Sequence, residues 1–234
     1  MAKECYSSSP TPFLMFESRF ICICGLPGIG SVGKVAADFL ATSLECSRIE
    51  DFFSSSFPPQ VMVSEGLAEL MHSELMRPRD KEKLLILSGD AQPLDVVGMH
   101  ELAGEILEAL KEQGVTDVIT LAAYVGETEE DVLGAASDPE GAAQLVEKNI
   151  TLLKSGAIGG LNGLLAGLAP SYGLRGICLL ATTSGSEPVD IAAAGKLLAA
   201  INELLNLDLD LTMLCPFAEE QEIEASSDID MNYR

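Results

Sequence analysis

A glycine-rich turn in the first part of the chain has a spacing that can hold a phosphate group. Gly28, Gly30 and Gly33 form the pattern GxGxxG between a predicted strand and a predicted helix. In this context, glycines permit a tight turn and let a pyrophosphate approach the backbone N–H groups at a helix N-terminus. Glu50 or Asp51 lies near the position expected for a ribose-binding carboxylate. Dinucleotide binding is therefore one interpretation of this motif.

Two other interpretations fit the same residues. The stretch from Gly28 to Lys34 matches GxxxxGK of a P-loop, but the next residue is Val35, where a hydroxyl is needed to hold magnesium. Binding of another anion or nucleotide, without that metal ligand, stays open. The third interpretation is structural: the glycines make a sharp turn, and Gly33 lets the helix lie close to the sheet.

A second polar segment follows a strongly apolar predicted strand. Asp90 and Gln92 lie just after Lys83 to Ser88, at the end of a strand where open α/β sheets usually place ligands. Alternatively, Asp90 only caps backbone N–H groups of the connection. If the two segments meet, they form a ligand pocket, and its predicted residues are Gly28, Gly30, Gly33, Lys34, Asp90 and Gln92.

The sequence offers few groups for acid–base, metal or nucleophilic chemistry. His72 and His100 are the only histidines and have no partners at metal-ligand spacing, so we predict no metal site and expect both to be exposed. Ser184 and Ser186 follow a predicted strand without a GxSxG elbow. We predict no catalytic residue, no metal and no cofactor, and a protein that is not an enzyme.

The composition argues against several partners. The net charge of −22 would repel nucleic acid and anionic lipid surfaces. No apolar run approaches the roughly 20 residues of a membrane span, and residues 1–12 lack a signal-peptide layout, so a cytoplasmic location is expected. The six cysteines lack CxxC spacing and are interpreted as reduced core residues.

Strands and helices are predicted to alternate along most of the chain. This order favours an α/β fold with a mainly parallel or mixed sheet covered on both faces. Predicted strands are Arg19–Cys24, Cys46–Phe52, Gln60–Val63, Leu67–Met76, Lys83–Ser88, Asp117–Ala122, Val132–Ala136 and Arg175–Thr182; predicted helices are Ser31–Leu44, Val97–Gln113, Pro139–Lys148 (entered through Asp138), Gly160–Leu168 and Pro188–Leu205.

The predicted domain organisation has three parts. Residues 1–12 form a flexible N-terminal arm rich in serine and proline, and residues 13–215 form one α/β domain, which fits the length of the chain. Residues 216–234 are acidic and form a C-terminal helix or mobile tail.

Five sequence blocks follow one another along the chain: Gly25–Lys34, Phe57–Gln60, Leu84–Pro93, Gly160–Gly167 and Gly176–Leu180. Together they resemble the PAC2 family, the archaeal-type relatives of proteasome assembly chaperones. The resemblance spans about Ile21 to Leu211 and implies a three-layer α/β/α domain with a phosphorylase/hydrolase-like architecture.

The resemblance also implies a function. It predicts a homo-oligomeric chaperone that binds proteasome α-subunits or the α-ring. The C-terminal segment Met231, Asn232, Tyr233 and Arg234 resembles the hydrophobic-Tyr-any ending with which such proteins dock on the ring, although Asn232 stands at the hydrophobic position. The alternative is an enzyme of ATP-grasp-like type that binds a nucleotide or phosphate ligand at the glycine turn.

Overall fold

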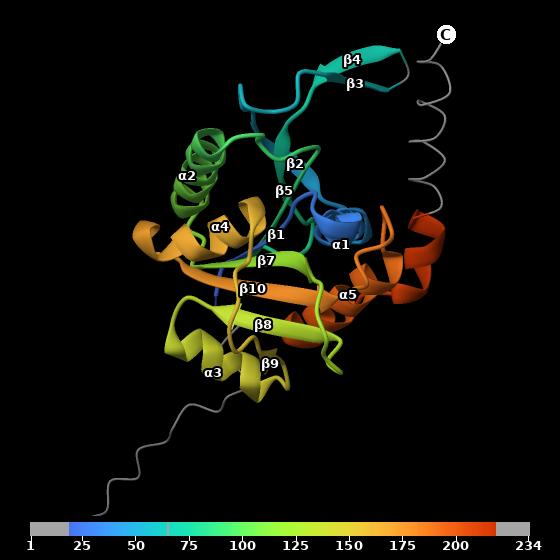
Figure 1. The fold of residues 1–234 in the computed structure, drawn as a ribbon. Helices are drawn as coiled ribbons and strands as arrows, with labels where there is room; N and C mark the ends of the chain where they lie inside the picture. Colours follow the sequence, from blue (N-terminus) through green and yellow to red (C-terminus); the bar gives the residue numbers. More distant parts are fainter. Residues whose placement is uncertain (1–18, 65, 219–234) are drawn as a thin grey trace, which may run out of the picture.

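The computed structural model describes residues 19–64 and 66–218 of the chain. In this part, a mixed sheet has eight strands in the order β2-β5-β6-β1-β7-β10-β8-β9, and β3 and β4 form a separate hairpin (Figure 1). The elements are β1 (Ile21–Gly25), α1 (Val32–Ser43), β2 (Ser47–Phe52), β3 (Val61–Ser64), β4 (Leu67–Leu70), β5 (Ser73–Arg77), β6 (Leu84–Gly89), α2 (Val96–Glu112), β7 (Asp117–Tyr124), β8 (Val132–Ala136), α3 (Pro139–Glu147), β9 (Thr151–Leu152), α4 (Gly160–Leu168), β10 (Arg175–Thr182) and α5 (Ile191–Leu205), with short 3-10 turns at Ile29–Ser31, Ala169–Tyr172 and Leu211–Met213.

The centre of the sheet is parallel and its flanks are mixed. Strands β6, β1, β7 and β10 run parallel as neighbours, and Ile23 of β1 pairs with Ile86 of β6 and Ile119 of β7. Strand β5 is antiparallel to both β2 and β6, and β8 is antiparallel to β10. The prediction of a mainly parallel or mixed sheet is therefore confirmed.

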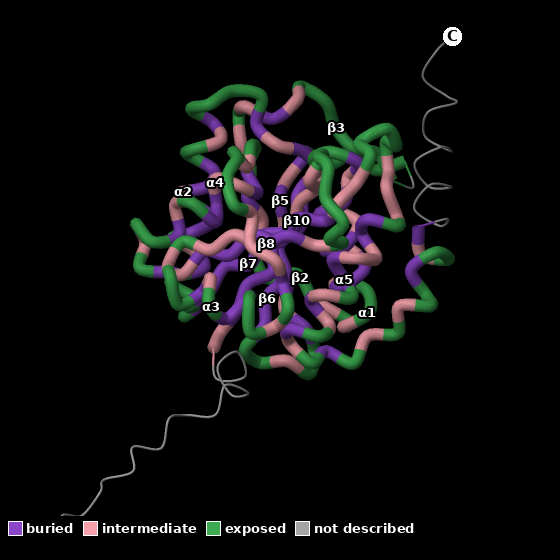
Figure 2. Tube along the Cα trace, turned by 60° about the horizontal axis from the view of Figure 1, so that its bottom comes forward, coloured by how far each residue is buried: buried purple, intermediate pink, exposed green. Residues whose placement is uncertain are grey.

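Alternate residues of the central strands face two different layers of helices. On β1, Ile21 and Ile23 join an apolar cluster with residues of α1 and α5, whereas Cys22 and Cys24 join a cluster with residues of α2 and α4. Because side chains along a strand alternate between faces, each face receives its own helix layer. The buried residues follow the strands through the centre of the molecule (Figure 2). The predicted three-layer α/β/α architecture is present.

Three helices begin at an aspartate whose carboxylate accepts a backbone hydrogen bond. Asp95 accepts from the N–H of Gly98 at 2.9 Å, Asp138 from that of Gly141 at 2.7 Å and Asp190 from that of Ala193 at 2.9 Å. The N-cap predicted at Asp138 is confirmed. Helix α5 begins at Ile191, later than the predicted Pro188, because Asp190 caps it there.

The prediction of one continuous strand over Leu67–Met76 is wrong. Met71 and His72 belong to no strand and separate β4 from β5. Strand β4 pairs only with β3 in the described part of the chain, whereas β5 joins the central sheet. His72 was expected to be exposed, but its side chain is only 13% exposed and its Nδ1 lies 3.3 Å from the Asp90 carboxylate. The polar histidine ring occupies the corner between hairpin and sheet instead of pointing into solvent.

Burial of the cysteines follows the apolar runs in most cases. Cys22, Cys24 and Cys178 are buried and free, as expected for reduced core residues, and burial raises the pKa of Cys178 to about 11. The interpretation of all six as core residues is wrong for Cys215, which is exposed. Cys46 is partly buried, and Cys5 lies outside the described residues.

The predicted division into arm, domain and tail stays a prediction. Residues 1–12 and residues 219–234 lie outside the described part of the chain. Within residues 19–64 and 66–218, no helix combines the length and the apolar character that crossing a membrane requires.

A cluster of charged side chains ties together the amino ends of the parallel strands. Asp117, the fully buried first residue of β7, lies 3.2 Å from the Arg19 guanidinium and 3.7 Å from that of Arg175. Arg175 also pairs with Asp138 at 2.8 Å and with Glu140 at 2.9 Å. The two arginines therefore join β1, β7 and β10 to the start of α3.

We predict that Asp117→Asn lowers the free energy of unfolding by about 3 kcal/mol, because it leaves two partly buried guanidinium groups without their shared carboxylate. Urea unfolding of the purified chain measures this change. Glu45→Gln is the control, because Glu45 pairs with Arg79 where both side chains are at least 64% exposed. The control should change stability by less than about 1 kcal/mol. Equal effects of the two substitutions would contradict a structural role for the Asp117 cluster.

The pair between Asp138 and Arg175 predicts a pH dependence. Burial alone would raise the pKa of Asp138, but the backbone N–H of Gly141 and the charge of Arg175 outweigh it and lower this pKa. The carboxylate then contributes stability that is full above its unfolded pKa of about 3.9 and is lost as the pH falls through the lower folded value.

Asp138→Asn keeps a capping side chain but removes the charge. We expect it to be less stable than the unmodified chain at neutral pH, with a difference that shrinks below about pH 4 as Asp138 is protonated. Chemical unfolding at a series of pH values measures the difference. A difference independent of pH would mean that the Asp138 charge does not contribute.

Candidate functional site

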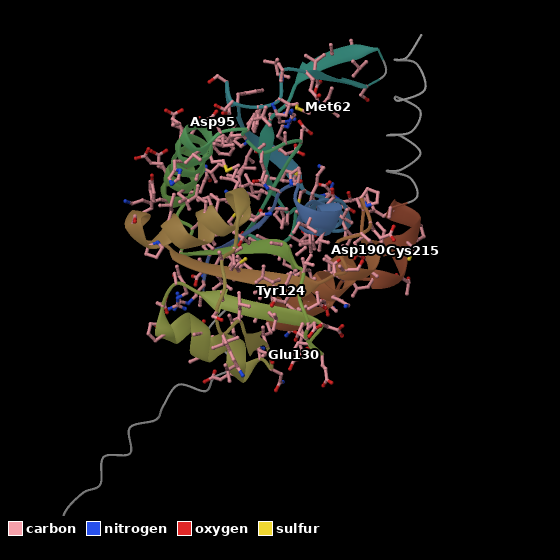
Figure 3. All side chains as sticks on the ribbon, viewed as in Figure 1. Met62, Asp95, Tyr124, Glu130, Asp190 and Cys215 are labelled. Carbon is pink, nitrogen blue, oxygen red and sulfur yellow. The ribbon has the colours of Figure 1, made fainter. Side chains whose placement is uncertain are left out.

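A cavity of about 420 Å³ opens at the carboxyl ends of the central parallel strands. The turn between β1 and α1, the end of β7 and the start of α4 form its walls; Tyr124 at the end of β7 is labelled in Figure 3. Open α/β sheets usually bind ligands at this edge. The lining residues include Gly28, Gly33, Gln92, Tyr124, Gly160 and Asn162.

Two amide side chains fix the walls of this cavity. Asn162 of α4 is buried and uses both ends of its amide on Leu26: its Oδ1 accepts from the backbone N–H, and its Nδ2 donates to the carbonyl, each at 3.1 Å. Gln92 donates through Nε2 to the Pro27 carbonyl and accepts at Oε1 from the N–H of Leu161 at 2.7 Å. The glycine turn is thereby tied to the N-terminus of α4.

The glycines of the turn are required by close packing. A Cβ on Gly33 would lie 2.1 Å from the carbonyl oxygen of Leu121 in β7, and one on Gly25 would lie 2.0 Å from the carbonyl oxygen of Gly33. Gly30 has a φ of 58°, a left-handed conformation that glycine adopts at low cost. Gly28 differs, because its backbone is extended and an added Cβ would meet nothing within 4 Å.

Only part of the predicted pocket comes together around the cavity. Gly28, Gly33 and Gln92 line it. Lys34 instead pairs with Asp38 of its own helix at 2.9 Å, facing a separate shallow depression. Asp90 accepts from the N–H of His72 at 3.0 Å, so it secures the hairpin corner.

The electrostatics of the turn do not resemble those of a phosphate site. None of the described residues that line the cavity carries a charged side chain. On the turn's other side, the backbone N–H of Asp190 donates to the Gly30 carbonyl at 2.8 Å, and this brings a carboxylate to the turn (Figure 3). A phosphate group would therefore find no cation in this lining and a negative charge nearby.

The sheet order also separates the parts of a dinucleotide site. Glu50 and Asp51 lie on β2, and strands β5 and β6 stand between β2 and β1. In the dinucleotide-binding fold, the ribose-binding carboxylate belongs to the strand next to the one that precedes the glycine turn. Glu50 and Asp51 therefore do not take the position of a ribose-binding carboxylate, although their distance from the turn along the sequence is suitable.

Sequence reasoning missed Asn162 as a positioning residue. The sequence marks Gly160–Gly167 as part of a predicted helix and as one of the blocks that resemble the PAC2 family, without a role for Asn162. The available signal was an amide side chain inside an otherwise apolar helix, because a buried amide needs hydrogen-bond partners. The sequence could not tell that its partner would be the backbone of Leu26, 136 residues away.

The fold and this cavity define a three-layer α/β protein with a glycine turn held by amide side chains. The family model described as the PAC2 family matches residues 22–227. The chain therefore belongs to the PAC2 family. It is similar to an uncharacterised protein of Methanocaldococcus jannaschii, with 34% identity over 199 residues, which cover 83% of this chain and 77% of that protein.

Two solved structures from Pyrococcus furiosus are similar over most of the chain. PbaB, described as an archaeal proteasome activator, is 32% identical with a TM-score of 0.76, covering 91% of this chain and 95% of PbaB. PbaA, described as an archaeal homolog of proteasome-assembly chaperone, is 30% identical with a TM-score of 0.75, covering 88% of this chain and 90% of PbaA.

The packing interpretation of the glycines gives a direct test. Gly33→Ala should lower the free energy of unfolding by about 2–3 kcal/mol, because its Cβ meets a backbone oxygen that cannot rotate away. Gly28→Ala should change it by less than about 1 kcal/mol, since the extended backbone there accepts any residue. Thermal and urea unfolding compare the two. Similar stability of both variants would contradict the close approach of α1 to β7.

Proposed function

We propose that this chain is a non-catalytic, homo-oligomeric chaperone of the cytoplasm that binds proteasome α-subunits or the α-ring. The observation that carries the proposal is the 32% identity to PbaB, described as a proteasome activator, over 91% of the chain. The similarity to PbaA, described as a homolog of proteasome-assembly chaperone, supports the same class of partner.

The candidate site gives little support to phosphate chemistry. The described lining of the cavity has no charged side chain to hold a phosphate group. Among the described residues, no group of three or more His, Cys, Asp or Glu side chains is placed to hold a metal ion. An enzyme of ATP-grasp type would need basic residues and metal-binding carboxylates around the triphosphate. The similarity to PbaA and PbaB is therefore the basis of the proposed function.

The segment from Met231 to Arg234 is the proposed docking element and lies outside the described residues. The proposal for it rests on Tyr233, whose ring would fill a pocket between α-subunits. The terminal carboxylate would accept a charge-assisted hydrogen bond from a cationic side chain of the ring. Such an aromatic anchor typically contributes much of the binding energy of a small contact.

Native mass spectrometry of the purified chain with archaeal proteasome α-subunits tests this proposal. We expect a complex with the intact chain, and binding weakened about tenfold or more by Tyr233→Ala or by deletion of Asn232–Arg234. Tyr233→Phe is the matched control, because it keeps the ring and removes only the hydroxyl.

The possible outcomes separate the parts of the proposal. Binding that survives the deletion would keep the chaperone role and transfer the contact to the folded domain. Absence of a complex with the intact chain would contradict binding to α-subunits, whatever the tail contributes.

A further inference from the structure

The last residues of β7 have no neighbouring strand on the side of β1. Strand β1 pairs with β7 only as far as Gly25 and Leu121, whereas β10 continues beside β7 as far as Tyr124. The Tyr124 carbonyl accepts from the N–H of Thr183 at 3.0 Å, on the side of β10. Because the backbone groups of successive strand residues point to alternate edges, those of Ala123 face the side where β1 has ended.

The backbone of Ala123 offers one donor and one acceptor to the cavity at the carboxyl edge of the sheet. Ala123 is one of the lining residues and is partly exposed. Among the described residues, neither the glycine turn nor any side chain forms a hydrogen bond with its N–H or its carbonyl. A strand edge of this kind pairs with a group that carries an N–H beside a carbonyl, as a further strand would. The amide group of a small molecule has both.

Apolar side chains line the cavity beside this backbone edge. Leu180 of β10 is buried in a small apolar cluster, and Tyr124, Leu153 and Ile158 pack against that cluster. All four residues also line the cavity. The Tyr124 ring adds an aromatic surface against which a flat ligand can pack. An apolar lining with a few placed polar groups is the usual composition of a small-molecule site.

Internal hydrogen bonds hold the walls of the cavity in place. Asn162 binds both backbone groups of Leu26, and Gln92 joins Pro27 to Leu161. A cavity that is already formed requires little further ordering when a ligand enters, which favours binding. Its volume of about 420 Å³ falls within the range of roughly 300–1,000 Å³ that is typical of small-molecule sites.

The electrostatics of the cavity select against charged ligands. Since none of the described lining residues has a charged side chain, an ion would lose its hydration there without gaining a counter-charge. The Asp190 carboxylate near the turn already accepts from the Thr183 hydroxyl and from the N–H of Ala193. The net charge of −22 also opposes the approach of anions. An uncharged ligand avoids these costs.

We propose that this cavity binds an uncharged, flat small molecule that presents an amide group to the backbone of Ala123. The amide N–H of the ligand donates to the Ala123 carbonyl, and the amide oxygen accepts from the Ala123 N–H. The apolar part of the ligand packs against Tyr124 and Leu180. An aromatic carboxamide or a lactam has this chemistry. The proposal goes beyond the binding of proteasome subunits and does not depend on it.

Four probes of nearly equal size and shape separate these requirements. Benzamide is uncharged and carries both N–H and carbonyl, acetophenone keeps the carbonyl but lacks the N–H, and benzoate and benzamidinium carry a negative and a positive charge. Saturation-transfer NMR of the purified full-length chain, with each probe titrated to about 50 mM, measures the dissociation constants. We expect about 3 mM for benzamide, binding about threefold or more weaker for acetophenone, and binding about tenfold or more weaker for both ions.

Substitutions that fill the cavity locate the binding. Gly28→Leu and Ala157→Leu each add an apolar side chain at the lining, and we expect each to weaken benzamide binding about fivefold or more. Both should fold, because a Cβ on Gly28 meets nothing within 4 Å and Ala157 is exposed; thermal unfolding verifies this for each. Gly167→Leu is the matched control, since a Cβ there also meets nothing within 4 Å and Gly167 is not part of the lining. It should leave benzamide binding within about twofold of the unmodified chain.

Four other outcomes would overturn the proposal. Absence of benzamide binding over the titration would exclude the site. Acetophenone binding as tightly as benzamide would show that the amide N–H is not recognised, and tighter binding of either ion would show that the ligand is charged. Benzamide binding that persists in the folded filling variants would place the probe elsewhere on the chain. Because no α-subunit is present, none of these results depends on whether the chain binds the proteasome.

Discussion

The contact of α1 with the two central strands is the constraint on which the rest of the domain depends. The helix approaches so closely that carbonyl oxygens occupy the places where the β-carbons of Gly25 and Gly33 would otherwise lie. Such an approach excludes any side chain between helix and sheet, so glycine is required at both positions. It also fixes where α1 begins, and the turn before it must then be tight enough to use Gly30 in a left-handed conformation.

The cavity at the carboxyl edge follows from the same constraint. Once the turn is fixed, its backbone polar groups need partners, and Asn162 and Gln92 supply them from distant parts of the chain. These amides satisfy Leu26 and Pro27 and join α4 to the turn. The amide groups that could bind a ligand thereby form hydrogen bonds within the chain instead. The cavity is consequently a by-product of the architecture as much as a candidate binding site.

Much of the fold was predictable because the local signals agreed with each other. The bounds of β8, α4 and β10 were predicted to the residue, and the Asp138 cap was read from its sequence context. The single strand predicted over Leu67–Met76 was wrong because apolar and polar residues are interspersed on both sides of Met71 and His72. No local signal marks where the chain leaves the hairpin and joins the central sheet. The prediction of the pocket residues was wrong in part, because a glycine pattern indicates a close approach to the backbone but does not identify the group that approaches. Gly33 meets a carbonyl oxygen of β7, and Lys34 turns away toward Asp38.

Proteins that share this fold can differ in function through surface segments that the packing of the core does not determine. The core, the glycine turn and the Asp117 cluster are held by contacts within this chain. The hairpin is different, because all eight residues of its two strands are exposed. An exposed segment that carries several large apolar side chains can serve as a contact surface for a partner outside the chain. Shared architecture therefore limits the class of protein, while the choice of partner depends on surfaces that the core does not determine.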